Sequence, residues 1–342
     1  MFHYIHTATT ARNSATVLDT KTKRISAWKR WNTFLSSIGI TNIFLDGFSR
    51  YQQNIIMSSF AQAIRKGTFS RGHHGELVEG TVATTLAHVA QAFRSNNRND
   101  PRLDRDGKTC FILQEQYRAY SNQDRAKQKQ KALPIRVLKK MHQLSQTHKE
   151  LALSHICIGA FFFAMRSCEY LTCTHNEDSK RTKILRLRNI QFKKNGISLT
   201  HDSRNIHLSD IVLITFEFQK NNNRNKTVHM FKTNDNTLCP VKAWAYTITR
   251  ILNTVPQANE NTKVCAYTDN GQTRYIDSTY ARAKIRGIVE LLGKEILGFT
   301  KEEVGLHSIR SGAAMAMFLA GVATLIIQRV GRWESDAFME LY

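Results

Sequence analysis

Four side chains near the end of the chain have types and spacing that suit phosphate chemistry. His307 and Arg310 are three residues apart, so on a helix they share one face. Trp333 follows Arg310 by 23 residues, and Tyr342 follows Trp333 by 9. A guanidinium can bind a phosphate through two parallel N–H bonds, an imidazole can take a proton, an indole N–H can donate, and a phenol can act as nucleophile. This set predicts cleavage of a phosphodiester without a metal.

The order of these residues resembles the catalytic box of tyrosine recombinases, the phage-integrase family. The small residues Gly312-Ala313-Ala314 after the His–Arg pair, the break at Gly321-Val322, and Gly331-Arg332-Trp333 at the expected distance carry the resemblance. It covers roughly residues 130 to 342. It implies that Tyr342 attacks phosphorus and becomes a 3′-phosphotyrosine, that Trp333 stands at the family's His-or-Trp position, and that no metal or other cofactor takes part.

Two residues upstream complete the set that the family uses. Arg166, in Met165-Arg166-Ser167-Cys168-Glu169, resembles the first family arginine in its Arg-x-x-Glu setting, and the alternative is an Arg–Glu pair at a helix end. Lys220, in a turn after an apolar strand, resembles the hairpin lysine that acts as general acid, with Lys226 as the alternative. For Arg332, we expect contact either with DNA or with an acidic neighbour.

Within the family, His-Ser-Ile-Arg-Ser-Gly-Ala-Ala and Leu238-Cys239-Pro240-Val241 look more like recombinases of eukaryotic mobile elements, such as cryptons. Ser311 and Gly312 replace a His and a hydroxyl residue of the usual pattern, and neither replacement removes an essential group. Tyr342 is the last residue of the sequence, and a terminal carboxylate beside the phenol should raise its pKa. We therefore expect either a truncated chain or impaired activity and assembly.

The elements that must position these residues fall into two parts. The first is expected to be all-α, with helices near residues 23–38, 51–64 and 81–93. The first of these helices carries an apolar stripe, and its basic face either is solvated or contacts DNA; the stripe comprises Ile25, Trp28, Trp31, Leu35 and Ile38. After the helical first part, a basic run extends from Arg125 to Lys140 without an acid, as in an interdomain linker. We expect Lys127, Lys129 and Lys131 of this run to lie along DNA phosphates.

The second part is expected to be mixed. An apolar helix, 151–165, precedes Arg166; strands are predicted at 184–190, 196–199, 211–218 and 226–230; helices then follow at 240–252, at 278–292, and after Ser308 and Val322. The fold class is thus mainly α with a small antiparallel sheet (α+β). The resemblance implies two domains, a helical core-binding (SAM-like) DNA-binding domain over 1–125 and an integrase-like catalytic domain over 126–342.

Composition agrees with a nucleic-acid partner. The formal charge is +22, from 49 Lys and Arg against 27 Asp and Glu, so polyanions should attract the protein. The six cysteines form no CxxC pair, and we expect no metal at the one cluster, Cys168, Cys173 and His175. With no 18-residue apolar run and no hydrophobic leader, we expect no membrane or secretion, and residence in the nucleus of a eukaryote or otherwise in the cytoplasm or nucleoid.

The sequence therefore predicts a site-specific recombinase that works on double-stranded DNA, and the resemblance implies a homotetramer on paired sites. Two alternatives keep the basic surface. A truncated or domesticated DNA-binding protein would bind without strand transfer, and a type IB topoisomerase would relax supercoils without joining partners. A nucleic-acid packaging protein would account for the charge but not for the ordered box.

Overall fold

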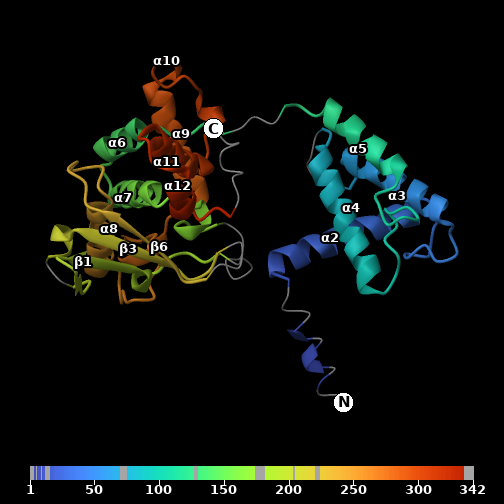
Figure 1. Ribbon diagram of the computed structural model, residues 1–342, viewed down its shortest axis with the longest axis horizontal. Coiled ribbons are helices and arrows are strands. Elements are labelled where there is room, and N and C mark those ends of the chain that lie inside the picture. Colours follow the sequence, from blue (N-terminus) through green and yellow to red (C-terminus); the bar gives the residue numbers. More distant parts are fainter. Residues whose placement is uncertain are drawn as a thin grey trace. The chain divides into compact units, whose positions relative to one another are not determined.

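The computed structural model describes residues 4, 6–8, 10–11, 16–69, 75–126, 130–173, 182–202, 205–219 and 224–334. The chain divides into two compact units, Met1–Lys127 and Gln128–Tyr342 (Figure 1). The predicted domain limits, 1–125 and 126–342, are close to this division. Among the described residues no helix is both long enough and apolar enough to cross a bilayer.

The described part of the first unit is built from helices, as the sequence predicted. They are α2 (Leu18–Ser37), α3 (Arg50–Arg65), α4 (Glu79–Ser95) and α5 (Phe111–Gln123). An aromatic cluster holds them together: the ring of Trp31 lies 5.1 Å from that of Phe60 and 6.1 Å from that of Phe93, both edge-on. Such pairs add to the burial of their apolar area, so this cluster is the centre of the unit's core.

The apolar stripe predicted for α2 is only half correct. Trp31 and Leu35 are buried, but Ile25 is 58% exposed and Ile38 is 47% exposed. The helix instead buries Ala27 and Phe34, because the ring of Phe34 packs against Phe60, 5.3 Å away. The buried arc is therefore set by the aromatic partners on the neighbouring helices.

The second unit is organised around α7 (His148–Phe162), which is buried along most of its length. It begins with a capping box between Thr147 and Glu150. It packs against α6 (Ile135–Leu144), α8 (Pro240–Thr254) and α11 (His307–Leu319). Gly159 allows the close approach of α8, since a Cβ there would lie 2.6 Å from the indole of Trp244. The other helices are α9 (Ser278–Leu292), α10 (Lys294–Leu297) and α12 (Thr324–Gly331).

A small antiparallel sheet lies below α7 in Figure 1, as the fold class predicted. Its order is β2 (Ile197–Leu199), β1 (Ile190–Lys194), β3 (Ile211–Phe216), β4 (Lys226–Phe231). The predicted β3–β4 hairpin is confirmed, with Phe216 paired to Lys226 at the end next to the turn. A separate hairpin, β5 (Ala266–Asp269) and β6 (Gln272–Tyr275), was not predicted.

The strand predicted at 184–190 is wrong. Leu185 and Leu187 are buried and alternate with Arg186 and Arg188, which imitates the period of a strand. Up to Asn189 the segment makes only an isolated bridge, between Arg186 and Lys263, and a short 3-10 turn, η3 (Leu187–Asn189), precedes β1, which begins at Ile190. In that turn the Asn189 side chain accepts the Arg186 N–H at 2.8 Å, so a local hydrogen bond replaces the ladder.

The segment 130–133 runs along the start of α11. The Lys131 N–H donates to the Glu303 carbonyl at 2.8 Å, and the Leu133 N–H donates to the Ser308 carbonyl at 2.9 Å. The two accepting residues, Glu303 and Ser308, lie on either side of His307 in the sequence. A Cβ at Gly312 would overlap the Leu133 carbonyl oxygen, so the glycine permits this contact.

Candidate active site

The candidate site gathers at the turn that follows α7. The backbone there is unusual, with a φ of 43° at Ala164, and it leads into η1 (Ser167–Glu169) directly after Arg166. Carbonyls at the end of a helix have no partner within it. Here the carbonyls of Phe163 and Ala164 accept hydrogen bonds from Arg332 and Arg310 respectively. Two arginines from far along the sequence therefore fix the turn that carries Arg166.

Arg310 is the more deeply buried of these two arginines, with 1% of its surface exposed. Its Nη1 donates to the Ala164 carbonyl and its Nη2 to the Gly331 carbonyl at the end of α12. Its guanidinium carbon lies 4.2 Å from the centre of the Trp333 ring. Arg310 thus joins α7, α11 and α12, and it brings Trp333 to the turn that carries Arg166.

Arg332 corrects one sequence-based prediction. It was expected to contact either DNA or an acidic neighbour, and the structure supports the second role. The residue is 6% exposed; its Nη2 donates to Glu169 Oε2 at 2.8 Å and its Nη1 to the Phe163 carbonyl at 3.0 Å. Its guanidinium also lies 3.6 Å from the Phe216 ring centre. A side chain enclosed in this way is not available to DNA.

Glu169 links the buried arginine to the accessible one. Its carboxylate is 1% exposed and accepts the Arg166 N–H at 2.8 Å and the Arg166 Nη1 at 3.3 Å, in addition to Arg332. The Arg166 side chain remains 21% exposed. The Arg–Glu pair considered as an alternative therefore exists, and it fixes one side of Arg166 while leaving part of the side chain at the surface.

His307 is the first residue of α11, and its side chain is exposed. Surrounding protein atoms still remove part of its hydration, which lowers its pKa, and the charges of Arg310 and Arg166 lower the pKa further. Both arginines are therefore close enough to His307 for their charges to act on its imidazole. These effects also keep the imidazole neutral near pH 7, which is the form that accepts a proton.

Trp333 is positioned by the glycine before Arg332. A Cβ at Gly331 would overlap the Trp333 ring, so only glycine lets the indole fold back over α12. Arg332 between them has a left-handed backbone, with φ 57° and ψ 42°. The motif Gly331-Arg332-Trp333 is thus a tight reversal that holds the ring against Arg310.

The structure brings Arg166, His307, Arg310 and Trp333 together. Lys220, Tyr342, Lys127 and Lys129 lie outside the described residues. Lys226 is exposed at the start of β4, and Lys131 is exposed before α6. Of the cysteine–histidine cluster, His175 also lies outside the described residues, and no metal-binding group of three His, Cys, Asp or Glu residues is present in the part of the chain that the structure describes.

The bond between Glu169 and Arg332 was missed, although both residues belong to motifs that the sequence singled out. They are separated by 163 positions, so no local spacing relates them. The available signal was the pair of arginines, Arg310 and Arg332, in a segment with many apolar and small residues. Such charges need a partner, and Glu169 belongs to the Arg-x-x-Glu motif that the sequence had already singled out.

No protein-family model matches the sequence, and a search of curated proteins finds no match. Solved structures do match. The XerH site-specific recombinase, in a post-cleavage complex with palindromic difH substrate, shares 13% identity with a TM-score of 0.51, over 92% of this chain and 72% of that one. The Tn1549 transposon integrase (residues 82–397), in complex with circular intermediate DNA, shares 10% identity with a TM-score of 0.48, over 87% of this chain and 81% of that one.

A likeness at 13% identity concerns the fold. It agrees with the helical first unit and with a second unit in which helices enclose α7 beside a small antiparallel sheet. The chain has the fold of the tyrosine recombinases.

Proposed function

We propose that the chain is a site-specific DNA recombinase that cleaves and rejoins strands through a 3′-phosphotyrosine. The observation that carries the proposal is the meeting of Arg166, His307, Arg310 and Trp333 at the end of α7. They come from three separate parts of the sequence and belong to one predicted chemistry. A structural role alone would not require the partly exposed Arg166 and the neutral His307 beside it.

In the proposed reaction the phenol oxygen of Tyr342 attacks phosphorus while the bond from phosphorus to the 5′ oxygen breaks. His307 accepts the phenol proton, and Lys220, or Lys226 in its place, gives a proton to the departing 5′ oxygen. Arg166 and Arg310 offset the charge that develops on the other two phosphate oxygens. Attack by a 5′ hydroxyl reverses these steps, so no external energy source is needed.

Arg310 has a second role in this proposal. Because its guanidinium donates to the Ala164 and Gly331 carbonyls, it fixes the turn that carries Arg166 and the end of α12. A direct bond to phosphate would exchange one of these carbonyls for a phosphate oxygen. Arg166 is therefore the arginine that we expect to meet the phosphate first.

The first unit offers a surface suited to the DNA backbone. Between α2 and α4 lies a hollow of about 300 Å³ that is rich in hydroxyl groups and cations, lined by Lys23, Ser26, Ala27, Arg30, Gly80, Thr81, Thr84, Thr85 and His88. Ser26 and Arg30 also line the adjoining hollow, with Lys29, Thr33 and Phe69. Hydroxyl, Lys and Arg side chains are the usual donors to DNA phosphates. We propose that this face contacts DNA and that four copies assemble on paired sites.

The decisive experiment is covalent trapping on nicked suicide duplexes drawn from the DNA that flanks the coding region. We expect a protein–DNA adduct with the wild type and none with Tyr342→Phe. Arg166→Ala should lower the cleavage rate at least about 100-fold, whereas Arg282→Ala, the same change at an exposed site on α9, should not.

An adduct that persists in Tyr342→Phe would disprove the nucleophile. Binding without any wild-type adduct would favour a DNA-binding protein without strand transfer, and relaxation of supercoils without joining would favour a type IB topoisomerase. A 5′-thio leaving group needs no proton, so it should restore cleavage only to the variant, Lys220→Ala or Lys226→Ala, that lacks the acid.

A further inference from the structure

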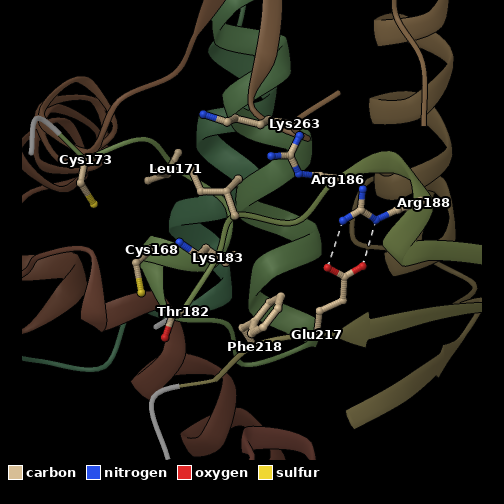
Figure 2. A pocket seen from close by; sticks show the side chains of 11 residues that line it. Cys168, Leu171, Cys173, Thr182, Lys183, Arg186, Arg188, Glu217, Phe218 and Lys263 are labelled. Carbon is tan, nitrogen blue, oxygen red and sulfur yellow. Dashed lines mark hydrogen bonds and ion pairs between the residues drawn. The ribbon is translucent and has the colours of Figure 1, made fainter. Parts of the chain in front are cut away.

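A pocket of about 240 Å³ lies beside the candidate active site (Figure 2). One wall includes Cys168, two residues after Arg166, and another includes Phe218, which leads from β3 into the hairpin turn. The pocket therefore adjoins both the turn that carries Arg166 and the hairpin that carries Lys220 in the sequence. Its other polar walls come from the segment 182–188 and from Lys263.

The pocket is strongly basic. Among the residues that the structure describes, Lys183, Arg186, Arg188 and Lys263 line it together with one acid, Glu217. Glu217 is already bound by Arg188, whose Nε and Nη2 donate to its two carboxylate oxygens at 2.9 and 3.2 Å, and the Asn189 side chain donates at 2.8 Å. These hydrogen bonds lower the pKa of Glu217 and keep it ionised. Among the described lining residues, one negative charge therefore faces four positive ones.

The backbone holds two of these cations side by side. Arg186 and Lys263 are directly opposite each other in an antiparallel bridge, and both lie at the same end of the pocket in Figure 2. The bridge is fixed on both sides, because the Leu187 N–H donates to the Thr262 carbonyl and the Val264 N–H to the Leu185 carbonyl, each at 3.0 Å. Like charges directly opposite are unfavourable in a folded protein. An anion between the two side chains would reverse that effect.

We propose that this pocket binds a phosphate of the DNA backbone, adjacent to the phosphate that Arg166 meets. The proposal rests on the DNA binding proposed above, but not on strand cleavage. A guanidinium and an ammonium on opposite segments match the charge and the several acceptor oxygens of one phosphate. Its position between the Arg166 turn and the hairpin puts this phosphate on the strand that enters the candidate active site.

The test is the salt dependence of binding to a fluorescein-labelled random-sequence duplex, measured by anisotropy on the full chain. Each lost phosphate contact should lower the slope of log affinity against log salt by about 0.9, which is roughly eightfold in affinity at 0.1 M salt. We expect this change for Lys263→Gln and for Arg186→Gln. Lys294→Gln, at an exposed site on α10 that does not line the pocket, is the matched control.

Three outcomes would overturn the proposal. The first is an unchanged slope in both pocket variants, and the second is an equal change in Lys294→Gln, which would indicate only a loss of overall charge. The third is an increase in melting temperature with inorganic pyrophosphate at constant ionic strength that Lys263→Gln abolishes without a change in DNA slope. That result would mean that the pocket takes a free phosphate.

Covalent trapping separates this proposal from the proposed function. With saturating DNA, Lys294→Gln should form the adduct at the wild-type rate, because Lys294 lines neither the pocket nor the candidate active site. A lowered slope in the pocket variants without any wild-type adduct would support the phosphate-binding pocket and disprove the recombinase activity. A wild-type adduct together with an unchanged slope in the pocket variants would support the recombinase activity and disprove the phosphate-binding pocket.

Discussion

At the scale of single residues, Glu169 determines whether Arg332 can be buried. The Arg332 side chain is 3% exposed, and Glu169, at 1%, is its partner at 2.8 Å. Glu169→Gln keeps the shape but removes the charge, which leaves a buried guanidinium without a counter-ion. We expect a loss of about 3–5 kcal/mol in the free energy of unfolding of the second unit.

The measurement is urea denaturation followed by a probe in the second unit. Glu302→Gln, the same change at an exposed position, is the control and should alter stability by less than about 0.5 kcal/mol. Equal midpoints for Glu169→Gln and Glu302→Gln would show that the Glu169–Arg332 pair contributes no net stability.

His155, on α7, predicts a dependence of stability on pH. Burial lowers its pKa to about 4, helped by the charges of His142 and Arg250, and its ring stacks on Tyr246 with centres 5.1 Å apart. The unfolded chain, with an ordinary value of about 6.5, binds the proton more tightly. This contribution to stability is therefore complete above about pH 6.5 and is lost as the pH falls towards 4.

The size of this effect is up to roughly 3 kcal/mol for a pKa difference of about 2.5 units. His155→Phe keeps a ring against Tyr246 and removes the titration. Its urea midpoint should therefore fall less than that of the wild type between about pH 7 and pH 4.5. If the two proteins lost the same stability over that range, the titration of His155 would not be the cause.

At the scale of elements, the segment 130–133 and α11 depend on Gly312. A Cβ at that position would overlap the Leu133 carbonyl oxygen, and the Leu133 backbone cannot move aside without cost because its N–H donates to the Ser308 carbonyl. We expect Gly312→Ala to destabilise the second unit by about 1–3 kcal/mol. It should also slow strand cleavage, because α11 carries His307 and Arg310.

A matched glycine gives the opposite expectation. Gly287 lies inside α9, and a Cβ there would meet nothing within 4 Å. Gly287→Ala should therefore stabilise the protein by roughly 0.5–1 kcal/mol through helix propensity alone. Thermal unfolding of the two variants compares the signs, and a stabilised Gly312→Ala would refute the close contact.

The elements also show how far the sequence could predict the structure. The period of apolar residues located α9 at its observed bounds, and the alternation in β3 located the hairpin. Prediction from periodicity failed at 184–190, where the buried Leu185 and Leu187 alternate with arginines but form no strand ladder. It also missed β5 and β6, which are short and partly exposed. Periodicity reports burial, whereas pairing depends on distant partners.

The same limit applies to the site. Spacing along one helix sufficed to group His307 with Arg310, and the Gly331-Arg332-Trp333 motif pointed to the ring that packs on Arg310. The sequence could not distinguish a DNA-facing Arg332 from a buried one, because its partner, Glu169, lies on another element. The roles of residues joined across the fold therefore required the structure.

At the scale of the whole molecule, both units are basic and each has its own core. The first unit contains 18 Lys and Arg against 9 Asp and Glu, and the second contains 31 against 18. The positive charge is therefore shared between the units, and each should be drawn to DNA independently. Once one unit has bound a duplex, the binding of the other unit to the same duplex is an intramolecular step.

This division predicts how the fragments and the full chain compare. Residues 1–127 and 128–342, expressed separately, should each unfold cooperatively and bind duplex DNA weakly. The full chain should bind about 100- to 10,000-fold more tightly than the better fragment, with a salt slope close to the sum of the two fragment slopes. Anisotropy over a range of salt concentrations measures both quantities. If the full chain bound no better than one fragment and shared its slope, the other unit would not contact the same DNA, and its charge would need a different partner.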